Sequence, residues 1–139
     1  MKRSLEDNKF LKFELSSDSF SEEDEESTNA RHDLFTTKTF EDIGITDETI
    51  LENLRGMNIL NPTRIQELAV PFLQSGQDIL VQAQTGSGKT LGFLLPLIDV
   101  LDRDSKKVQA IILAPSRELV AQIGLVGNQL FQNTDIRIM

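Results

Sequence analysis

A glycine-containing loop constrains the fold of this chain more than any other sequence feature. The loop reads AQTGSGKT over residues 83–90, between a short apolar run and a longer apolar-periodic segment. The run at 78–81 predicts a buried strand, and the segment 89–101 predicts a helix. In this order, a strand, a loop and a helix can direct the backbone N–H groups of residues 86–88 at a phosphate group. The pattern therefore predicts a phosphate-binding loop.

The side chains of the loop suit a nucleoside triphosphate. Lys89 offers an ammonium group to the β- and γ-phosphates, and the Thr90 hydroxyl suits Mg²⁺, which prefers oxygen ligands. A plain glycine turn is the alternative, but it has no need of a lysine followed by a threonine at the helix start. Lys89 and Thr90 are therefore the candidate catalytic residues. The candidate nucleotide-binding residues of the loop are Gln84, Thr85, Gly86, Ser87, Gly88, Lys89 and Thr90.

The alternation of strand and helix continues after the loop. Residues 108–113 predict a second buried strand, Ser116 is expected to cap a helix running to about Phe131, and residues 136–138 predict the start of a third strand. Strands that alternate with helices imply parallel pairing through right-handed crossovers. The sequence therefore predicts an α/β fold with a parallel sheet flanked by helices.

Two helices are expected before the loop. We expect Thr46 to cap the first helix and Gly56 to end it. Thr63 should cap the second helix, because the preceding proline favours an extended conformation just before it. Pro71 is expected to kink or shorten that second helix.

Residues 1–34 differ in composition from the rest of the chain. Residues 1–30 hold four basic and nine acidic side chains. The difference is a net charge of −5, which is more than half of the formal net charge of −8 of the whole chain. The run SSDSFSEEDEES has one aromatic residue, so it cannot bury enough apolar surface to offset the entropy of ordering. We predict a disordered acidic extension over 1–34, which leaves protein partners of this tail open, and a folded domain over 35–139.

The overall composition excludes several classes of site. The net charge of −8 argues against a generally basic nucleic-acid-binding surface, though a local basic groove remains open. The chain has no cysteine and one histidine, which excludes disulfides, thiolate metal sites, cysteine nucleophiles and histidine clusters. The longest charge-free run, 119–134, is too short and polar to span a membrane. The N-terminus lacks a secretory signal, so we expect an intracellular protein, cytoplasmic or nuclear, and no oligomer is indicated.

Three blocks of the sequence resemble the DEAD-box RNA helicases. GMNILNPTRIQ, residues 56–66, resembles the family's Q motif, with Phe40 in the place of its upstream aromatic residue. AQTGSGKT matches the family's motif I in full, and APSREL, residues 114–119, resembles motif Ia with Ser116 where threonine is usual. The blocks follow the family's order over about 40–119. The resemblance implies an ATP-dependent RNA helicase, represented here by an incomplete first RecA-like domain.

Within the Q-motif block, the resemblance implies recognition of adenine. The Gln66 amide offers an acceptor and a donor together, which matches the N6 and N7 edge of adenine. Phe40 is expected to stack on the base, and the resemblance places Arg64 beside the nucleotide. Thr63 and Gln66 also have the spacing of a capping box, in which the glutamine bonds to the cap residue's own N–H. The two roles of Gln66 are not exclusive.

Within motif Ia, the resemblance implies contact with the backbone of single-stranded or duplex RNA. The Ser116 hydroxyl and the free N–H groups at a helix start suit a phosphate, and Arg117 adds a positive charge. The candidate RNA-binding residues are Pro115, Ser116 and Arg117. An ordinary serine-capped helix with a surface arginine is the alternative.

The sequence contains no D-E-A-D, and its densest acidic run, 22–26, precedes the phosphate loop. In the family, the metal-holding carboxylates and the second RecA-like domain follow motif Ia. We therefore expect this chain to be part of a longer protein, and to bind ATP and Mg²⁺ without appreciable hydrolysis. Two alternatives remain open: a non-enzymatic adenine-nucleotide-binding module, and a different P-loop NTPase such as a small kinase.

Overall fold

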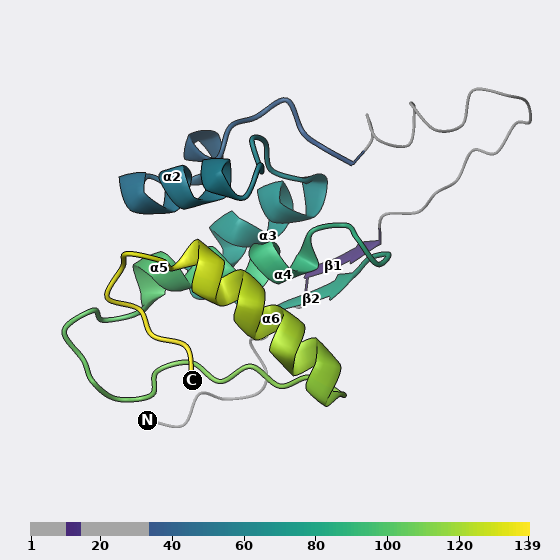
Figure 1. Ribbon diagram of the computed structural model, residues 1–139. Helices are drawn as coiled ribbons and strands as arrows, with labels where there is room; N and C mark the ends of the chain where they lie inside the picture. The colour runs from purple at the N-terminus through teal and green to yellow at the C-terminus, as the bar shows by residue number, and fades with distance from the viewer. Residues whose placement is uncertain (1–10, 15–33) are drawn as a thin grey trace, which may run out of the picture.

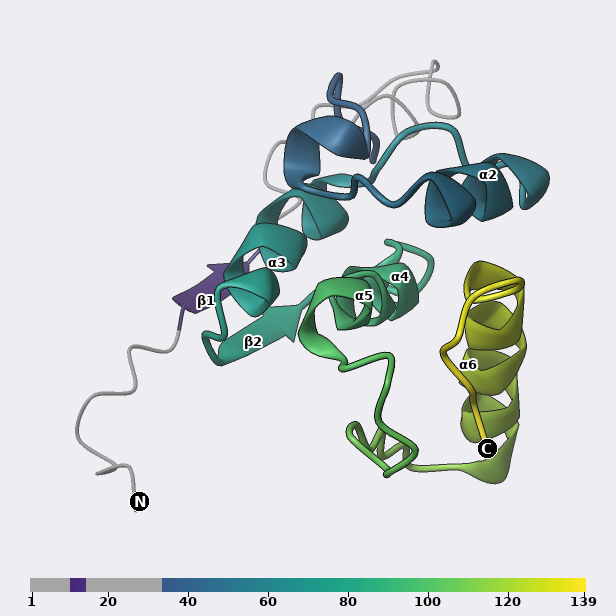
Figure 2. The ribbon, with the colours of Figure 1, turned by 90° about the vertical axis from the view of Figure 1, so that its left-hand side faces the viewer.

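The computed structural model describes residues 11–14 and 34–139. Helices dominate this part of the chain, and a small sheet lies at one side (Figure 1). In chain order, the elements are β1 (Leu11–Glu14), the 3₁₀ helix η2 (Glu41–Ile43), α2 (Glu48–Gly56), α3 (Arg64–Gln74), β2 (Ile79–Gln82), α4 (Lys89–Leu94), α5 (Leu97–Val100) and α6 (Arg117–Leu130). Figure 2 shows α4 and α5 between α3 and α6, with α2 across one end.

The hydrophobic core lies where α2, α3, α4 and α6 meet. Each of these helices turns an apolar stripe inward, and fully burying one such side chain contributes about 1.5–3 kcal/mol. The largest fully buried apolar side chains are Ile45, Ile50, Leu54, Val70, Leu94, Leu95 and Leu130. Because these residues come from segments on both sides of the phosphate loop, the core fixes the α2–α3 segment against the helices that follow the loop.

The two helices before the loop begin close to their predicted caps. α2 is capped by Asp47, one residue after the predicted Thr46, and its carboxylate accepts a hydrogen bond from a backbone N–H at 3.2 Å. Aspartate is at least as good a helix cap as threonine, so the intrinsic capping preferences of the two residues did not identify the correct one. Thr63 caps α3 as predicted, in a complete capping box. Pro71 lies inside α3 and does not end it.

The sheet is parallel, as predicted, but it is formed by a different pair of segments. β2 begins at Ile79, one residue later than expected, and it pairs with β1. Leu11 lies opposite Ile79, and Glu14 lies opposite Gln82. Leu80 is 57% exposed, so β2 is only partly buried, whereas the sequence predicted a buried strand.

Four residues of the predicted acidic extension form β1, which their composition did not predict. Within the acidic extension this short stretch alternates two apolar residues, Leu11 and Phe13, with two charged ones, and it pairs with β2 through backbone N–H and C=O groups. Apart from residue 34, the remainder of the predicted tail lies outside the described residues.

The predicted strands at 108–113 and 136–138 are wrong. In the structure, both segments are irregular. Ile111 and Leu113 are 79% and 90% exposed. A strand needs a neighbouring strand to satisfy its N–H and C=O groups, and within the described ranges no segment pairs with either one. Apolar composition alone therefore misidentified these two segments.

The single helix predicted over 89–101 is divided into α4 and α5. Pro96 lies between them, and it lacks the N–H that would bond to the carbonyl of Gly92 four residues earlier. Leu95 and Pro96 keep helical backbone angles, so the interruption is local. The sequence-based prediction missed this effect of Pro96.

α6 begins and ends close to its predicted bounds. Ser116 caps it as expected, and its hydroxyl accepts a hydrogen bond from the backbone N–H of Leu119 at 3.2 Å. The helix ends at Leu130, one residue before the predicted end. Of the helices in the described ranges, none has the length and apolar character needed to cross a bilayer.

Candidate nucleotide-binding site

The loop 83–90 connects the end of β2 to the start of α4, as the sequence predicts. Gly86 and Gly88 have φ angles of +82° and +87°, in the left-handed region that side chains with a Cβ rarely adopt. Gly88 is also the residue from which α4 begins. The glycines are therefore required by the backbone path of the loop, whatever the loop binds.

Two side chains of the loop bond to the loop's own carbonyl groups. Lys89 Nζ donates to the carbonyl oxygens of Ala83 and Gln84, each at 2.5 Å. Ser87 Oγ also donates to the Gln84 carbonyl, at 2.8 Å. A charged donor makes stronger hydrogen bonds than a neutral one. The Lys89 ammonium is therefore held at the loop and not extended into solvent.

Gln66, from the first turn of α3, reaches the same loop. Its Nε2 donates to the Gly88 carbonyl oxygen at 3.1 Å, and its Oε1 accepts from the Thr63 N–H at 3.0 Å. The side chain is 1% exposed. The capping role left open by the sequence is therefore real, and the same amide also joins the Q-motif block to the phosphate loop.

This contact leaves no room for a side chain at residue 88. A Cβ placed on Gly88 would lie 2.5 Å from Gln66 Nε2 and 2.8 Å from Thr63 Oγ1. Thr63 is thus a residue of the candidate site, which sequence reasoning identified only as a helix cap. Its position three residues before Gln66 in one motif was the signal that could have found it.

The other predicted nucleotide-binding residues lie in different environments. Phe40 is 3% exposed and packs in the hydrophobic core, so its stacking on a base stays a prediction. Arg64 is exposed at the first turn of α3, and its backbone N–H bonds to the Leu34 carbonyl oxygen at 3.0 Å. Thr90 is partly buried. The exposed loop residues are Gln84, Thr85 and Gly86.

The predicted RNA-binding residues lie elsewhere on the molecule. Pro115, Ser116 and Arg117 are all exposed at the start of α6. That end of α6 lies away from the start of α4, where the phosphate loop ends (Figures 1 and 2). The loop 83–90 and residues 115–117 therefore lie apart from each other in this structure.

Two ion pairs join the cap of α2 and a residue of α3 to residues outside the helices. The hydrogen-bonded Arg103 guanidinium, 2.6 Å from the Asp47 carboxylate, lowers the pKa of Asp47, and the same bond raises the pKa of Arg103. The Glu67 carboxylate, 2.8 Å from Lys38 Nζ, raises the pKa of Lys38 through their hydrogen bond. The Asp47–Arg103 pair is partly exposed and contributes about 0–1 kcal/mol, and the Lys38–Glu67 pair lies at the surface, where water and salt weaken it.

Comparison with known proteins assigns the chain to a family. The family model for the DEAD/DEAH box helicases matches residues 63–139, more than half of the sequence. The chain belongs to the DEAD/DEAH box helicase family. In this family member, the matched segment begins at the cap of α3 and includes both the phosphate loop and motif Ia.

Individual relatives agree with this assignment. The DEAD-box ATP-dependent RNA helicase CshA of Bacillus cereus is 39% identical over 101 residues, which are 73% of this chain and 19% of CshA. The crystal structure of a DEAD box protein from Methanococcus jannaschii has a TM-score of 0.63 and 34% identity, covering 69% of this chain and 26% of that one. A structure of S. cerevisiae Dbp5 bound to Gle1 and IP6 has a TM-score of 0.66 and 33% identity. The match covers 73% of this chain and 26% of that one.

These likenesses confirm the predicted fold class for this helicase family member. The chain is an α/β protein with the fold of the RecA-like domain of DEAD-box proteins. It spans about a fifth of the length of the curated relatives that it matches.

Proposed function

We propose that this chain binds ATP through the loop 83–90 and Gln66, as the nucleotide-binding part of an ATP-dependent RNA helicase. The hydrogen bond from Gln66 Nε2 to the Gly88 carbonyl carries the proposal, because it joins a candidate base-recognition residue to a candidate phosphate-binding loop. The similarity to CshA supports it, since that relative is an ATP-dependent RNA helicase.

The loop supplies the phosphate-binding groups. Backbone N–H groups of residues 86–88 would bind a phosphate as donors, in the manner of loops that precede a helix. Lys89 would exchange its bonds to the carbonyls of Ala83 and Gln84 for bonds to the β- and γ-phosphates. An ammonium that already lies at the loop needs only a small movement to do so.

Gln66 has unused hydrogen-bonding capacity for adenine. Its Nε2 carries a second hydrogen beyond the bond to Gly88, and its Oε1 has a second lone pair beyond the bond from Thr63. Adenine presents an acceptor and a donor on one edge, whereas guanine presents two acceptors there. Gln66 could therefore keep its structural bonds while it selects adenine, but at 1% exposed it would first have to become accessible to the base. Phe40 would have to become exposed before it could stack on the base.

Thr90 suits a Mg²⁺ ion bound together with the phosphates. Its hydroxyl follows Lys89 in the first turn of α4 and makes no hydrogen bond to any other residue in the described ranges. Mg²⁺ needs few protein ligands, because it keeps several waters and binds phosphate oxygens. The described residues contain no cluster of acidic or histidine side chains that could hold the ion alone. When bound, the ion would neutralise phosphate charge.

We further propose that RNA contacts the start of α6 through its phosphate backbone. Ser116 and Arg117 are exposed there, beside backbone N–H groups at the N-terminus of a helix with 14 residues. Pro115 has no N–H and would contribute by shape alone. Because these groups read no base edge, binding should be insensitive to RNA sequence and should weaken with salt.

Calorimetric titration with ATP and Mg²⁺ tests the nucleotide site. We expect binding by the parent chain, loss of binding in Lys89→Ala, and little change in Lys107→Ala, a control at an exposed lysine outside the loop. Equal ATP affinity of the parent and Lys89→Ala would contradict the proposal.

Phosphate release with saturating RNA tests the proposed lack of hydrolysis. We expect no turnover, because phosphoryl transfer depends on charge-stabilising groups whose contribution is about 10³–10⁵ for an arginine finger alone. Turnover that Lys89→Ala abolishes would contradict this part and would make the chain an NTPase by itself. ATP binding without RNA binding would favour the alternative of a non-enzymatic nucleotide-binding module.

A further inference from the structure

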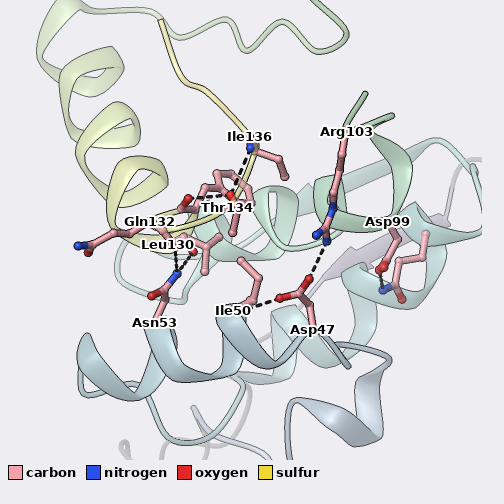
Figure 3. A network of polar contacts seen from close by, with 11 residues as sticks. Asp47, Ile50, Asn53, Asp99, Arg103, Leu130, Gln132, Thr134 and Ile136 are labelled. Carbon is pink, nitrogen blue, oxygen red and sulfur yellow. Dashed lines mark hydrogen bonds and ion pairs between the residues drawn. The ribbon is translucent and has the colours of Figure 1, made fainter. Parts of the chain in front are cut away.

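The side chain of Asn53 bonds to the C-terminal end of α6. Its Nδ2 donates to the carbonyl oxygens of Leu130 and Gln132, at 2.9 Å and 2.7 Å (Figure 3). The carbonyl of Leu130, the last residue of α6, lacks a partner within the helix, and Gln132 lies two residues past that end, so the Asn53 amide satisfies groups that would otherwise bond to water. One side chain of α2 therefore joins two segments about 80 residues apart.

α6 is held mainly at this end. Gly127, Leu130 and Phe131 are buried, and Leu130 and Phe131 belong to the hydrophobic core. Toward the other end, Leu119 and Val120 are 37% and 52% exposed. The half of the helix that carries motif Ia therefore has little packing of its own within the described part of the chain.

A helix anchored at one end amplifies small changes at the anchor. α6 has 14 residues, so it is about 21 Å long at 1.5 Å per residue. A tilt of about 10° at the Leu130 end would move Ser116 and Arg117 by about 4 Å over that length. Such a shift is larger than the tolerance of a hydrogen bond to a phosphate oxygen.

The same helix, α2, also fixes the chain segment that leads toward α6. The Asp47 carboxylate, at the cap of α2, accepts from the Arg103 guanidinium at 2.6 Å (Figure 3). Arg103 lies in the loop after α5, and Asn53 lies on α2, six residues after its cap Asp47. α2 therefore bonds to the segment on the N-terminal side of α6 and to the end of α6 itself.

We propose that Asn53 is a positioning residue for motif Ia: its two hydrogen bonds fix the C-terminal end of α6 and so place Ser116 and Arg117 for RNA. The inference rests on the proposed RNA contact of these two residues. Packing of Leu130 and Phe131 holds α6 against the core, but apolar contacts are non-directional. The two hydrogen bonds of Asn53 are directional, so they fix the orientation of α6 relative to α2.

Spin-label distances test the placement of α6 without RNA. The chain has no cysteine, so Glu48→Cys on α2 and Ala121→Cys on the exposed half of α6 give two unique labelling sites. We expect a narrow distance distribution in this background and in Asn128→Ala, an exposed asparagine of α6. We expect a broader or shifted distribution in Asn53→Ala and in Asn53→Asp, which keeps the shape but lacks both donors. Unchanged distributions in both Asn53 variants would overturn the inference.

RNA and ATP affinities then separate positioning from general destabilisation. With a short fluorescein-labelled polyuridine strand, we expect Asn53→Ala to bind RNA about tenfold more weakly, the effect of about one to two lost hydrogen bonds. We expect the ATP affinity of Asn53→Ala to be unchanged, because Lys89 and Gln66 lie on α4 and α3 and make their hydrogen bonds to residues other than Asn53. A parallel loss of ATP affinity would show a structural role only and would overturn the inference. If the parent binds no RNA, the proposed function fails, and the spin-label distances still decide whether Asn53 places α6.

Discussion

At the scale of single residues, the contact between Gln66 and Gly88 is the feature on which the candidate site depends. The Gln66 amide closes a capping box with Thr63 and also bonds to the loop at residue 88. The capping box was predictable, because it is a local pattern of four residues. The bond to Gly88 was not, because it joins residues 22 apart in sequence and depends on how α3 packs against α4.

Gly88→Ala should damage the site more than Gly86→Ala. Both glycines have positive φ, so both substitutions strain the backbone, but only at Gly88 would the new Cβ lie within 3 Å of Gln66 and Thr63. Overpacking of this kind costs about 1–3 kcal/mol. Urea denaturation should show Gly88→Ala less stable than Gly86→Ala by about that amount, with weaker ATP binding. Equal stability of the two variants would contradict the close contact of Gln66 and Thr63 with the loop at residue 88.

At the scale of elements, α2 makes polar contacts with two segments that lie far from it in the sequence. Its cap Asp47 bonds to Arg103, and its Asn53 bonds to the end of α6. Sequence patterns located the helix to within one residue at its start, because caps and apolar periodicity are local signals. They could not show either long-range bond. In the same way, the cap of α6 was predictable from Ser116, whereas the division of α4 from α5 depends on the missing N–H of Pro96.

The Asp47–Arg103 pair should make stability depend on pH. The folded pKa of Asp47 lies below its ordinary value of 3.8, so its contribution is present above that value and is lost as the pH falls through the folded pKa. Asn also caps helices well, so Asp47→Asn removes the ion pair and keeps the cap. Unfolding by urea should show the variant less stable by about 0.2–1 kcal/mol near pH 7.

The difference should be smaller at about pH 3 than near pH 7, because below the ordinary aspartate pKa of 3.8 the unfolded chain binds more protons than the folded one, and it should vanish only below the folded pKa. Asp78→Asn, an exposed aspartate without an ion pair in the described part of the chain, serves as the control and should show no such trend. A stability difference for Asp47→Asn that is the same at both pH values would contradict a role for the charge.

At the scale of the whole molecule, the fold class was predictable and the sheet was not. A glycine loop between a strand and a helix, with helices and apolar runs alternating after it, indicated an α/β protein of this family, and the likeness to DEAD-box structures confirms it. Which segments pair depends on neighbours that a single-segment pattern does not contain. The apolar run at 108–113 therefore predicted a strand that is absent, and four residues at 11–14 formed a strand that composition did not indicate.

A lysine at residue 111 should be tolerated by this fold. Ile111 is 79% exposed, and exposed substitutions usually change stability by less than about 0.5 kcal/mol. Leu95 is fully buried, so Leu95→Ala should cost about 2–5 kcal/mol and serves as the comparison. Urea denaturation of Ile111→Lys and Leu95→Ala measures both effects. A loss above about 2 kcal/mol in Ile111→Lys would show that residues 108–113 are packed as a strand after all.

The central claim is that the Q-motif block and the phosphate loop form one adenine-nucleotide site. Calorimetric titration of the parent and Gln66→Ala with ATP and with GTP tests it most directly, with Gln129→Ala, an exposed glutamine of α6, as the control. We expect the parent and the control to prefer ATP, and Gln66→Ala to lose that preference by weakening ATP binding more than GTP binding. Equal effects on both nucleotides, or none, would contradict the claim.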